Sequence, residues 1–309
     1  MSAINSYTRV LDGAQARALE DLLRSRGYRF DEVPHARFAA EGRDVKVVFY
    51  QSGKLVVQGK GTEEFVQFVL EPEVLGRAEL GYEEVLKPEL TLPRLGVDES
   101  GKGDLFGPLC VAGVYLNADM IGAWKQAGIR DSKSVSSDQR IARLAEVIRT
   151  TRGCVTTVVP IGNPAYNRLH VKLGSVNRIL AWGHARVIEN LLNQRDRMKP
   201  PPVRAVLDQF ASSTAVVTRA LLAAGRELEI IQRHKAESDL AVAAASILAR
   251  DEFVQRLKRL GEDSGVPLPK GAGPEAGRAL AAWVERNGRD RLGEVAKLHF
   301  RNVAALSGG

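Results

Sequence analysis

The feature that most constrains the fold of this chain is an alternation of short apolar strands with amphipathic helices that begins after residue 94. The expected strands are Val111–Leu116, Cys154–Pro160, Val203–Leu207 and Leu228–Gln232, and the expected helices are Gln139–Thr150, Val176–Arg195, Ser213–Ala224, Leu240–Arg259 and Gly277–Asn287. Alternation of this kind is typical of α/β domains, in which helices cover a central sheet. We therefore expect residues 95–309 to form an α/β domain.

The first part of the chain has a different pattern, that of a small α+β module. Apolar residues at helical spacing predict a helix over Ala14–Arg26, which ends at Gly27. Two strand-like runs, Val45–Tyr50 and Lys54–Gln58, are separated by a short turn that contains glycine, which predicts a β-hairpin. Thr62 precedes two glutamates and an apolar stretch, so we expect it to cap an amphipathic helix.

A segment with two prolines and no hydrophobic periodicity, residues 86–94, separates these two patterns. Proline interrupts helices and strands alike, so this segment is expected to be an extended linker. We predict a first domain over residues 1–87, a linker over 88–94 and a second domain over 95–309. A chain of 309 residues is long enough for two domains of the usual ~100–200 residues each.

Positive charge is concentrated in the second domain. The whole chain has a formal net charge of +7, with 44 Lys and Arg against 37 Asp and Glu. Residues 1–90 carry a net charge of −3 and residues 91–309 a net charge of +10. Such a surplus fits a polyanionic partner such as a nucleic acid, and it fits a solvated basic surface equally well.

Several classes of protein are excluded or disfavoured by the same sequence. No apolar run approaches the ~18–20 residues that a membrane helix needs, and the start of the chain lacks the pattern of a secretory signal. The two cysteines, Cys110 and Cys154, are too few for a disulfide framework or a cysteine-based zinc site. We therefore expect a cytoplasmic protein without membrane association.

The most informative segment combines two adjacent acids with a glycine-rich stretch. Asp98 and Glu99 would point to opposite faces of a strand, so that one faces a site while the other reaches it around the edge. The sequence Gly101-Lys102-Gly103 would let the backbone approach a phosphate closely, with Lys102 adding positive charge. An acidic turn between strands is the alternative interpretation.

Further acids lie where strands end or helices begin. Asp208 ends an expected strand, and Glu237 and Asp239 precede the helix that begins at Leu240. Carboxylates at strand ends of an α/β sheet are well placed to converge in a crevice. A cluster of oxygen ligands suits Mg²⁺ or Mn²⁺, and no set of Cys and His favours zinc. Each acid could instead be a surface charge or, as for Asp239, a helix N-cap.

A series of short motifs along the chain carries a family resemblance. The motifs are Val97-Asp98-Glu99-Ser100-Gly101-Lys102-Gly103, Gly107-Pro108, Arg130-Asp131-Ser132-Lys133, Tyr166-Asn167, Asn177, Leu180-Ala181-Trp182-Gly183-His184-Ala185, Lys235-Ala236-Glu237, Ala244-Ala245-Ser246-Ile247, Leu268-Pro269-Lys270-Gly271 and Lys297-Leu298-His299-Phe300. With them the chain resembles the type 2 family of ribonucleases H. Lys102 resembles the ribonuclease HIII branch, since ribonuclease HII usually has Arg there. The hairpin residues Ser52-Gly53-Lys54-Leu55 and Gln58-Gly59 resemble the TBP-like substrate-binding domain of that branch.

The resemblance implies a fold and an activity. The fold is ribonuclease H-like, a central sheet flanked by helices, preceded by a small α+β TBP-like domain. The activity is that of an endonuclease, a hydrolase that cleaves the RNA strand of RNA/DNA hybrids and leaves 5′-phosphate and 3′-hydroxyl ends. The cofactors implied are Mg²⁺ or Mn²⁺, two ions about 3.5–4 Å apart. The partner is the hybrid duplex, and the expected state is a monomer.

The resemblance also implies roles for the acids. Asp98, Glu99 and Asp208 fall on the metal-binding carboxylates of the family, and with Glu237 they form the catalytic set. Ribonuclease HII has Asp where this chain has Glu237. Asp239, two residues further on, is therefore a rival for the fourth acid, and Glu237 is favoured because it keeps the Lys-Ala frame.

The substrate-binding residues carried over are less specific. Gly101-Lys102-Gly103 would lie against the RNA strand, and Ser132 and Lys133 would contact the nucleic-acid backbone, with helix capping as the alternative. Tyr166 would stack on a sugar or base, or else be an ordinary partly buried aromatic residue. His184 lies on an apolar helix and is expected to be a core histidine.

Two residues of the hairpin, Lys54 and Gln58, would meet the duplex, although the negative charge of the first domain argues against this. Three alternative functions stay open. The first is ribonuclease HII-like incision at single ribonucleotides in DNA. The second is a nucleic-acid-binding protein without catalysis. The third is a phosphotransferase, which the absence of a Gly-x4-Gly-Lys-Ser/Thr pattern disfavours.

Overall fold

The computed structural model describes residues 4–77, 79, 88–130, 132, 135, 137–209, 215–221, 223–234 and 236–305. The chain divides into two compact units, Met1–Leu90 and Thr91–Gly309, which are described separately here. The division falls inside the expected linker over residues 88–94. Residues 86 and 87 of the proline-containing segment lie outside the described residues.

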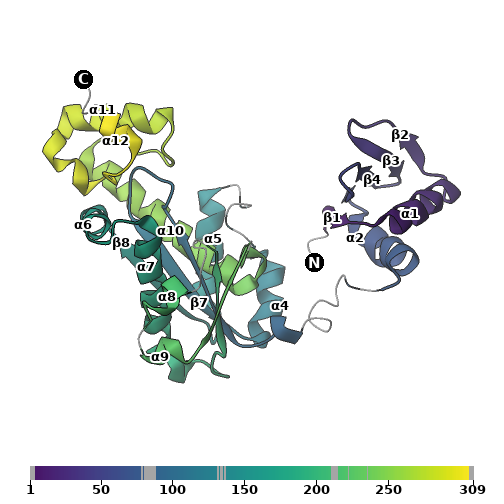
Figure 1. Cartoon of the computed structure of the whole chain (residues 1–309), viewed down its shortest axis with the longest axis horizontal. Coiled ribbons are helices and arrows are strands. Elements are labelled where there is room, and N and C mark those ends of the chain that lie inside the picture. Colours follow the sequence, from purple (N-terminus) through teal and green to yellow (C-terminus); the bar gives the residue numbers. More distant parts are fainter. Residues whose placement is uncertain are drawn as a thin grey trace. The chain divides into compact units, whose positions relative to one another are not determined.

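The first unit is built on a five-stranded antiparallel sheet with the strand order β1-β5-β4-β3-β2 (Figure 1, purple). Its strands are β1 (Ser6–Val10), β2 (Arg29–Asp31), β3 (Ala36–Gly42), β4 (Val45–Tyr50) and β5 (Lys54–Gln58). Its helices are α1 (Gly13–Ser25), α2 (Thr62–Phe65) and the π-helical continuation η1 (Val66–Leu75). Apolar residues of α1 and η1 form one core with the inner face of the sheet, as expected for a helix-covered antiparallel sheet.

Local sequence explains most of these boundaries. Asp12 caps α1 by accepting hydrogen bonds from the backbone N–H groups of Ala14 and Gln15, at 2.9 and 2.8 Å. The predicted hairpin of β4 and β5 is present. The prediction that Thr62 caps the next helix is wrong. Thr62 is the first helical residue, and its hydroxyl donates to the Gly59 carbonyl at 2.8 Å.

The second unit contains a five-stranded mixed sheet with the strand order β10-β9-β6-β7-β8. The strands are β6 (Arg94–Ser100), β7 (Leu109–Leu116), β8 (Val155–Ile161), β9 (Arg204–Asp208) and β10 (Glu229–Arg233). β6, β9 and β10 are parallel, whereas β7 pairs antiparallel with both β6 and β8. Every residue of β7 is buried, so the centre of the sheet is covered on both faces.

Helices surround this sheet, and three of them were not predicted. The helices are α4 (Ala118–Ala127), α5 (Asp138–Thr150), α6 (Asn163–Leu173), α7 (Val176–Leu192), α8 (Ala215–Thr218), α9 (Ala223–Arg226), α10 (Leu240–Ser264), α11 (Pro274–Asn287) and α12 (Arg301–Ala305), with short 3₁₀ turns η2 (Pro88–Leu90), η4 (Arg195–Arg197), η5 (Ala236–Ser238) and η6 (Arg289–Glu294). The unpredicted ones are α4, α6 and α12. The single helix predicted over Ser213–Ala224 is instead the pair α8 and α9, separated by a turn.

Two long helices pack against opposite faces of the sheet at glycines. A Cβ at Gly96 of β6 would lie 2.1 Å from the Ala241 backbone of α10, so α10 crosses β6 in direct backbone contact. A Cβ at Gly113 of β7 would lie 2.3 Å from Val187 of α7. Gly96 and Gly113 belong to opposite faces, because Gly113 pairs with Val97, the neighbour of Gly96. Within the described residues, no helix is long and apolar enough to cross a membrane.

Candidate active site

The adjacent acids Asp98 and Glu99 lie near the carboxyl end of β6 and face different helices. Asp98 shares the face of Gly96 and accepts a hydrogen bond from Ser246 on α10. Glu99 lies on the opposite face, where its Oε2 is 3.1 Å from Nε2 of His184 on α7. The strand alternation therefore gives the two neighbouring carboxylates different supporting helices.

A cavity of about 450 Å³ at this end of the sheet brings the predicted residues together. Its wall includes three of the four acids and the glycine segment. These residues are Asp98, Glu99, Asp208, Gly101, Lys102 and Gly103. Ser132 also reaches the cavity, although it is only 5% exposed and its hydroxyl is hydrogen-bonded to that of Ser246 at 2.7 Å. The cavity is thus acidic at its centre.

Asp208 links the sheet to the turn that carries the fourth acid. It ends β9, which is the parallel neighbour of β6. Its Oδ1 accepts a hydrogen bond from the backbone N–H of Ala236 at 3.2 Å. This bond fixes the start of η5, whose next residue is the half-buried Glu237. Glu237 follows directly but is not among the residues that line the cavity.

Asp239, the rival for the fourth acid, has other partners. It is 2% exposed, and its carboxylate accepts two hydrogen bonds from Nε of Arg94, at 2.9 and 3.0 Å. It also caps α10 by accepting from the backbone N–H of Ala241 at 2.9 Å. The Asp239 carboxylate is thus committed to a buried arginine and a helix cap, and it does not line the cavity. The N-cap alternative is therefore the one that the structure shows.

The electrostatics of the cavity favour a cation. Burial of the Asp98 carboxyl group, then the neighbouring charge of Glu99, raise its pKa from 3.8 to about 8, and Asp208 adds to the rise. The donors are all carboxylate oxygens, which suit Mg²⁺ and Mn²⁺. Among the described residues, no three His, Cys, Asp or Glu side chains already form a metal-binding cluster. The residues present fit a divalent cation, which would relieve the repulsion that raises the Asp98 pKa.

The glycine segment is shaped by the chain around it. Gly101 has a φ of +92°, and a Cβ there would lie 2.2 Å from the Pro108 carbonyl oxygen, so only glycine fits. A Cβ at Gly103 would meet nothing within 4 Å, which leaves its backbone open to a ligand. Lys102 is 43% exposed, with Nζ 4.0 Å from Glu99 Oε1. This geometry leaves room for a phosphate beside the acids.

A buried lysine holds the end of the glycine segment. Nζ of Lys297 donates to the carbonyl oxygens of Asp104 and Gly107, at 2.9 and 2.7 Å. Burial lowers the pKa of Lys297 to about 8. The Asp104 carboxylate in turn accepts from the backbone N–H of Gly271 at 2.6 Å. The motifs around Lys297 and Gly271 therefore hold the end of the glycine segment, which forms part of the cavity wall.

The remaining predicted residues have mixed outcomes. Tyr166 is fully buried in a cluster with Leu109, Ile161 and Ile179, and burial raises its pKa to about 12. This burial leaves no ring surface for stacking on a nucleic acid, so the ordinary-aromatic alternative holds. His184 is buried as predicted, but its contact with Glu99 was not foreseen. Lys133 lies outside the described residues.

In the first unit, Lys54 and Gln58 are exposed on the same face of β5, opposite the buried Leu55 and Val57. They lie on the face that the helix-packed core leaves uncovered. This placement suits a contact surface, and it leaves their role a prediction.

Comparisons with known proteins agree with the fold and the cavity. The family model described as ribonuclease HII matches residues 95–303, and a model described as a domain of unknown function, DUF3378, matches residues 26–75. The fold and the cavity thus define a type 2 ribonuclease H with an additional N-terminal domain.

Full-length relatives identify the branch. The chain is 42% identical over 299 residues to ribonuclease HIII of Chlamydia pneumoniae, with 94% of each chain covered. It is 38% identical over 308 residues to ribonuclease HIII of Protochlamydia amoebophila, covering 100% of this chain and 99% of the relative. The crystal structure of Bst-RNase HIII in complex with Mn²⁺ is 30% identical and superposes with a TM-score of 0.65 over 98% of each chain. The chain therefore belongs to the ribonuclease HIII family, endonucleases that cleave the RNA strand of RNA/DNA hybrids, which confirms the predicted fold class and branch.

Proposed function

We propose that Asp98, Glu99, Asp208 and Glu237 are the catalytic acids of this ribonuclease and that they hold Mg²⁺ or Mn²⁺, two ions in the complete site. The observation that carries the proposal is the single cavity shared by the first three carboxylates and the glycine segment. Support for the metal comes from the all-oxygen donor set and from the raised pKa of Asp98. The relative Bst-RNase HIII was crystallised with Mn²⁺.

The residues have distinct tasks in hydrolysis of the RNA strand. When bound, the divalent ions supply charge neutralisation and activation of water for attack on phosphorus. Asp98, Glu99 and Asp208, which line one cavity, would hold the ions. Glu237, brought near by the bond from Ala236 to Asp208, orients the attacking water. The products carry 5′-phosphate and 3′-hydroxyl ends.

The glycine segment reads the RNA strand. The open backbone at Gly103 lies beside the acids, where the strand to be cut must pass. Discrimination of RNA from DNA depends on the 2′-hydroxyl, and we assign its recognition to backbone groups of residues 101–103. Lys54 and Gln58 on the exposed face of β5 contact the duplex at a distance from the cut. We expect the enzyme to act as a monomer in the cytoplasm, where free cysteines such as its two are usual.

One assay tests this proposal. Cleavage of an all-RNA/DNA hybrid and of a DNA duplex with a single ribonucleotide is measured with Mg²⁺ and with Mn²⁺, for the wild-type chain and for Asp208→Asn. We expect metal-dependent cleavage of the hybrid, and we expect Asp208→Asn to lower it by about 10²-fold or more, because the metal charge acts on the transition state. Preferred cutting at the single ribonucleotide would favour ribonuclease HII-like incision instead. An active Asp208→Asn variant would refute the assignment of the acids.

A further inference from the structure

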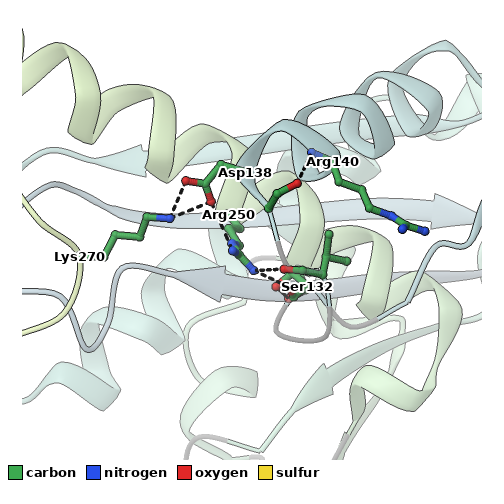
Figure 2. Close-up of polar contacts among 8 residues, drawn as sticks. Ser132, Asp138, Arg140, Arg250 and Lys270 are labelled. Atoms are coloured by element: carbon green, nitrogen blue, oxygen red, sulfur yellow. Dashed lines mark hydrogen bonds and ion pairs between the residues drawn. The ribbon is translucent and has the colours of Figure 1, made fainter. Parts of the chain in front are cut away.

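A cluster of charged residues at the rim of the cavity is not used by the proposed catalytic set. Lys270, in the loop before α11, places Nζ 2.6 and 2.7 Å from the two carboxylate oxygens of Asp138, the first residue of α5 (Figure 2). Arg250 of α10 reaches the same carboxylate at 3.3 Å. Arg250 and Lys270 line the catalytic cavity, and Lys270 also lines a neighbouring cavity of about 630 Å³ together with Asp138. The lysine is thus held at the edge of the active site by an acid that lies outside it.

The two cations of this cluster are held differently. Arg250 donates to the backbone carbonyls of Ser132 and Val135, the latter at 3.3 Å, and its side chain is 21% exposed (Figure 2). Lys270 is 47% exposed, and among the described residues its polar partner is the Asp138 carboxylate. Both partners are exposed, so solvent screens the ion pair and it contributes little to stability. The lysine can therefore exchange Asp138 for another anion at small cost.

The backbone that carries Lys270 is fixed to the glycine segment. The N–H of Gly271 donates to the Asp104 carboxylate at 2.6 Å, and the carbonyl of Gly271 accepts from the N–H of Leu105 at 3.0 Å. The base of the Lys270 side chain therefore has a set position relative to Gly101-Lys102-Gly103, while its ammonium group is held by the exposed Asp138 carboxylate. A duplex seated on the glycine segment would bring its phosphates past this lysine.

We propose that Lys270 binds a backbone phosphate of the hybrid, a subsite beyond the scissile phosphate, and that Asp138 is the internal anion that it leaves on binding. The proposal rests on the proposed function, because it takes the hybrid to occupy the catalytic cavity. Arg250 remains beside Asp138 after the exchange, so that the carboxylate keeps one positive neighbour. The centre of the cavity is acidic. The cluster therefore offers the positive charge of Lys270 to the cavity only when a phosphate of the substrate replaces Asp138 as its partner.

The test is a comparison of hybrid binding by Lys270→Gln and Asp138→Asn, measured in EDTA so that no cleavage occurs. We expect Lys270→Gln to weaken binding about tenfold at low salt and to reduce the slope of log K against log[salt] by about one, as for the loss of one phosphate contact. We expect Asp138→Asn to tighten binding about threefold, because the lysine no longer has an internal competitor. Lys258→Gln is the matched control, since Lys258 is 76% exposed on the same helix as Arg250 but outside the catalytic cavity, and it should bind like wild type.

The opposite signs separate this proposal from a purely structural ion pair. If Asp138 and Lys270 only hold α5 to the loop, both substitutions weaken binding or neither changes it, and the proposal is overturned. In the double variant the gain from Asp138→Asn should disappear, because it depends on Lys270; independent, additive effects would also overturn the exchange. Urea unfolding of each variant checks that α5 stays folded, and Lys270→Arg should recover most of the affinity.

The strand that supplies the phosphate can be identified with neutral methylphosphonates. A single methylphosphonate at the right position, in the RNA strand or in the DNA strand, should remove the difference between wild type and Lys270→Gln. If no position in either strand removes it, the subsite is not a phosphate site. Because binding is measured without metal, failure of this proposal and failure of the catalytic assignment give different results: the first appears in EDTA binding, the second in cleavage by Asp208→Asn.

Discussion

Strand β6 carries charged side chains at both ends, Arg94 at its start and Asp98 with Glu99 near its carboxyl end, in opposite surroundings. Arg94 is 1% exposed and forms a buried ion pair with Asp239 at 2.9 Å. At the other end Asp98 lies against two further carboxylates, and its pKa is raised to about 8. One end of the strand pairs opposite charges, and the other brings like charges together.

The difference separates residues that stabilise the fold from residues that catalyse. The Arg94–Asp239 pair joins the start of β6 to the N-terminus of α10, so it sets how the helix crosses the sheet. The crowded carboxylates at the other end cost stability in the absence of a cation, which is common for functional sites. The same helix, α10, serves both ends, since Ser246 contacts Asp98 two turns beyond the cap at Asp239.

The largest effect is expected at the acidic end. Asp98→Asn should lower kcat/KM for hybrid cleavage by about 10³-fold or more, since the central carboxylate of the set is lost. The free energy of unfolding without metal should stay the same or rise, because Asn needs neither the buried charge nor the uptake of a proton that Asp98 requires on folding. Cleavage assays and urea unfolding of the same preparation check both. A variant that unfolds more easily but cleaves normally would show that Asp98 stabilises the fold and does not take part in catalysis.

The opposite pattern is expected at the paired end. Arg94→Met leaves Asp239 as an uncompensated buried charge, so it should lower the free energy of unfolding by about 3–5 kcal/mol. Arg256→Gln is the control on α10, the helix that Asp239 caps. Because the pair of Arg256 with Glu252 is exposed, its loss should lower the free energy of unfolding by at most about 0.5 kcal/mol. Denaturant titration measures both. Equal stability of the two variants would show that the buried pair does not hold α10.

The two acids around η5 sharpen the comparison, because they are only two residues apart. Glu237→Gln should lower hybrid cleavage by about 10²-fold with little change in stability, since loss of a positioned acid–base group costs about this much. Asp239→Asn should instead lower the free energy of unfolding, by about 1 kcal/mol or more, through the weakened ion pair and helix cap. Parallel activity and unfolding measurements distinguish them. Loss of cleavage by a folded Asp239→Asn variant would restore Asp239 as the fourth acid.

These residues show how much of the fold and of the site could be predicted from the sequence. The acids of the cavity were found because residue type and motif spacing mark them, and the α/β alternation predicted most strands of the second unit. Three contacts could not be predicted because the partners are far apart in the sequence. His184 and Glu99 are separated by 85 residues, and Arg94 and Asp239 by 145. Ser246 and Ser132 are separated by 114 residues. A hydrophobic pattern marks a residue as buried, but it does not say which strand lies opposite. For the same reason the sequence left open whether Tyr166 stacks on the substrate or is an ordinary buried aromatic residue, and the structure places it in the core.

The crowding of carboxylates also predicts a pH dependence. The folded-state pKa of Asp98 is raised above its unfolded value of 3.8, so between about pH 4 and pH 8 the folded chain binds more protons than the unfolded chain. In EDTA, stability should therefore fall as pH rises through this window, and Asp98→Asn should remove about 1 kcal/mol or more of that fall, since one pKa unit corresponds to about 1.4 kcal/mol. Thermal unfolding at several pH values tests this. Identical pH profiles for the two proteins would show that Asp98 is ionised without a cation.

The smallest effect on stability is expected for a substitution of Lys102, the lysine of the glycine segment, which lies near Glu99. Its Nζ is 4.0 Å from Glu99 and its side chain is 43% exposed, so solvent screens the pair, in contrast to the buried pair of Arg94. Lys102→Gln should change the free energy of unfolding by less than about 0.5 kcal/mol. It should still weaken hybrid binding several-fold and lower the salt slope by about one, because a phosphate beside the acids would lose its contact. Lys172→Gln, an exposed lysine on α6, is the control for a general change of charge. A large loss of stability in Lys102→Gln with normal binding would mean that this end of β6, like the other, is held by its ion pair.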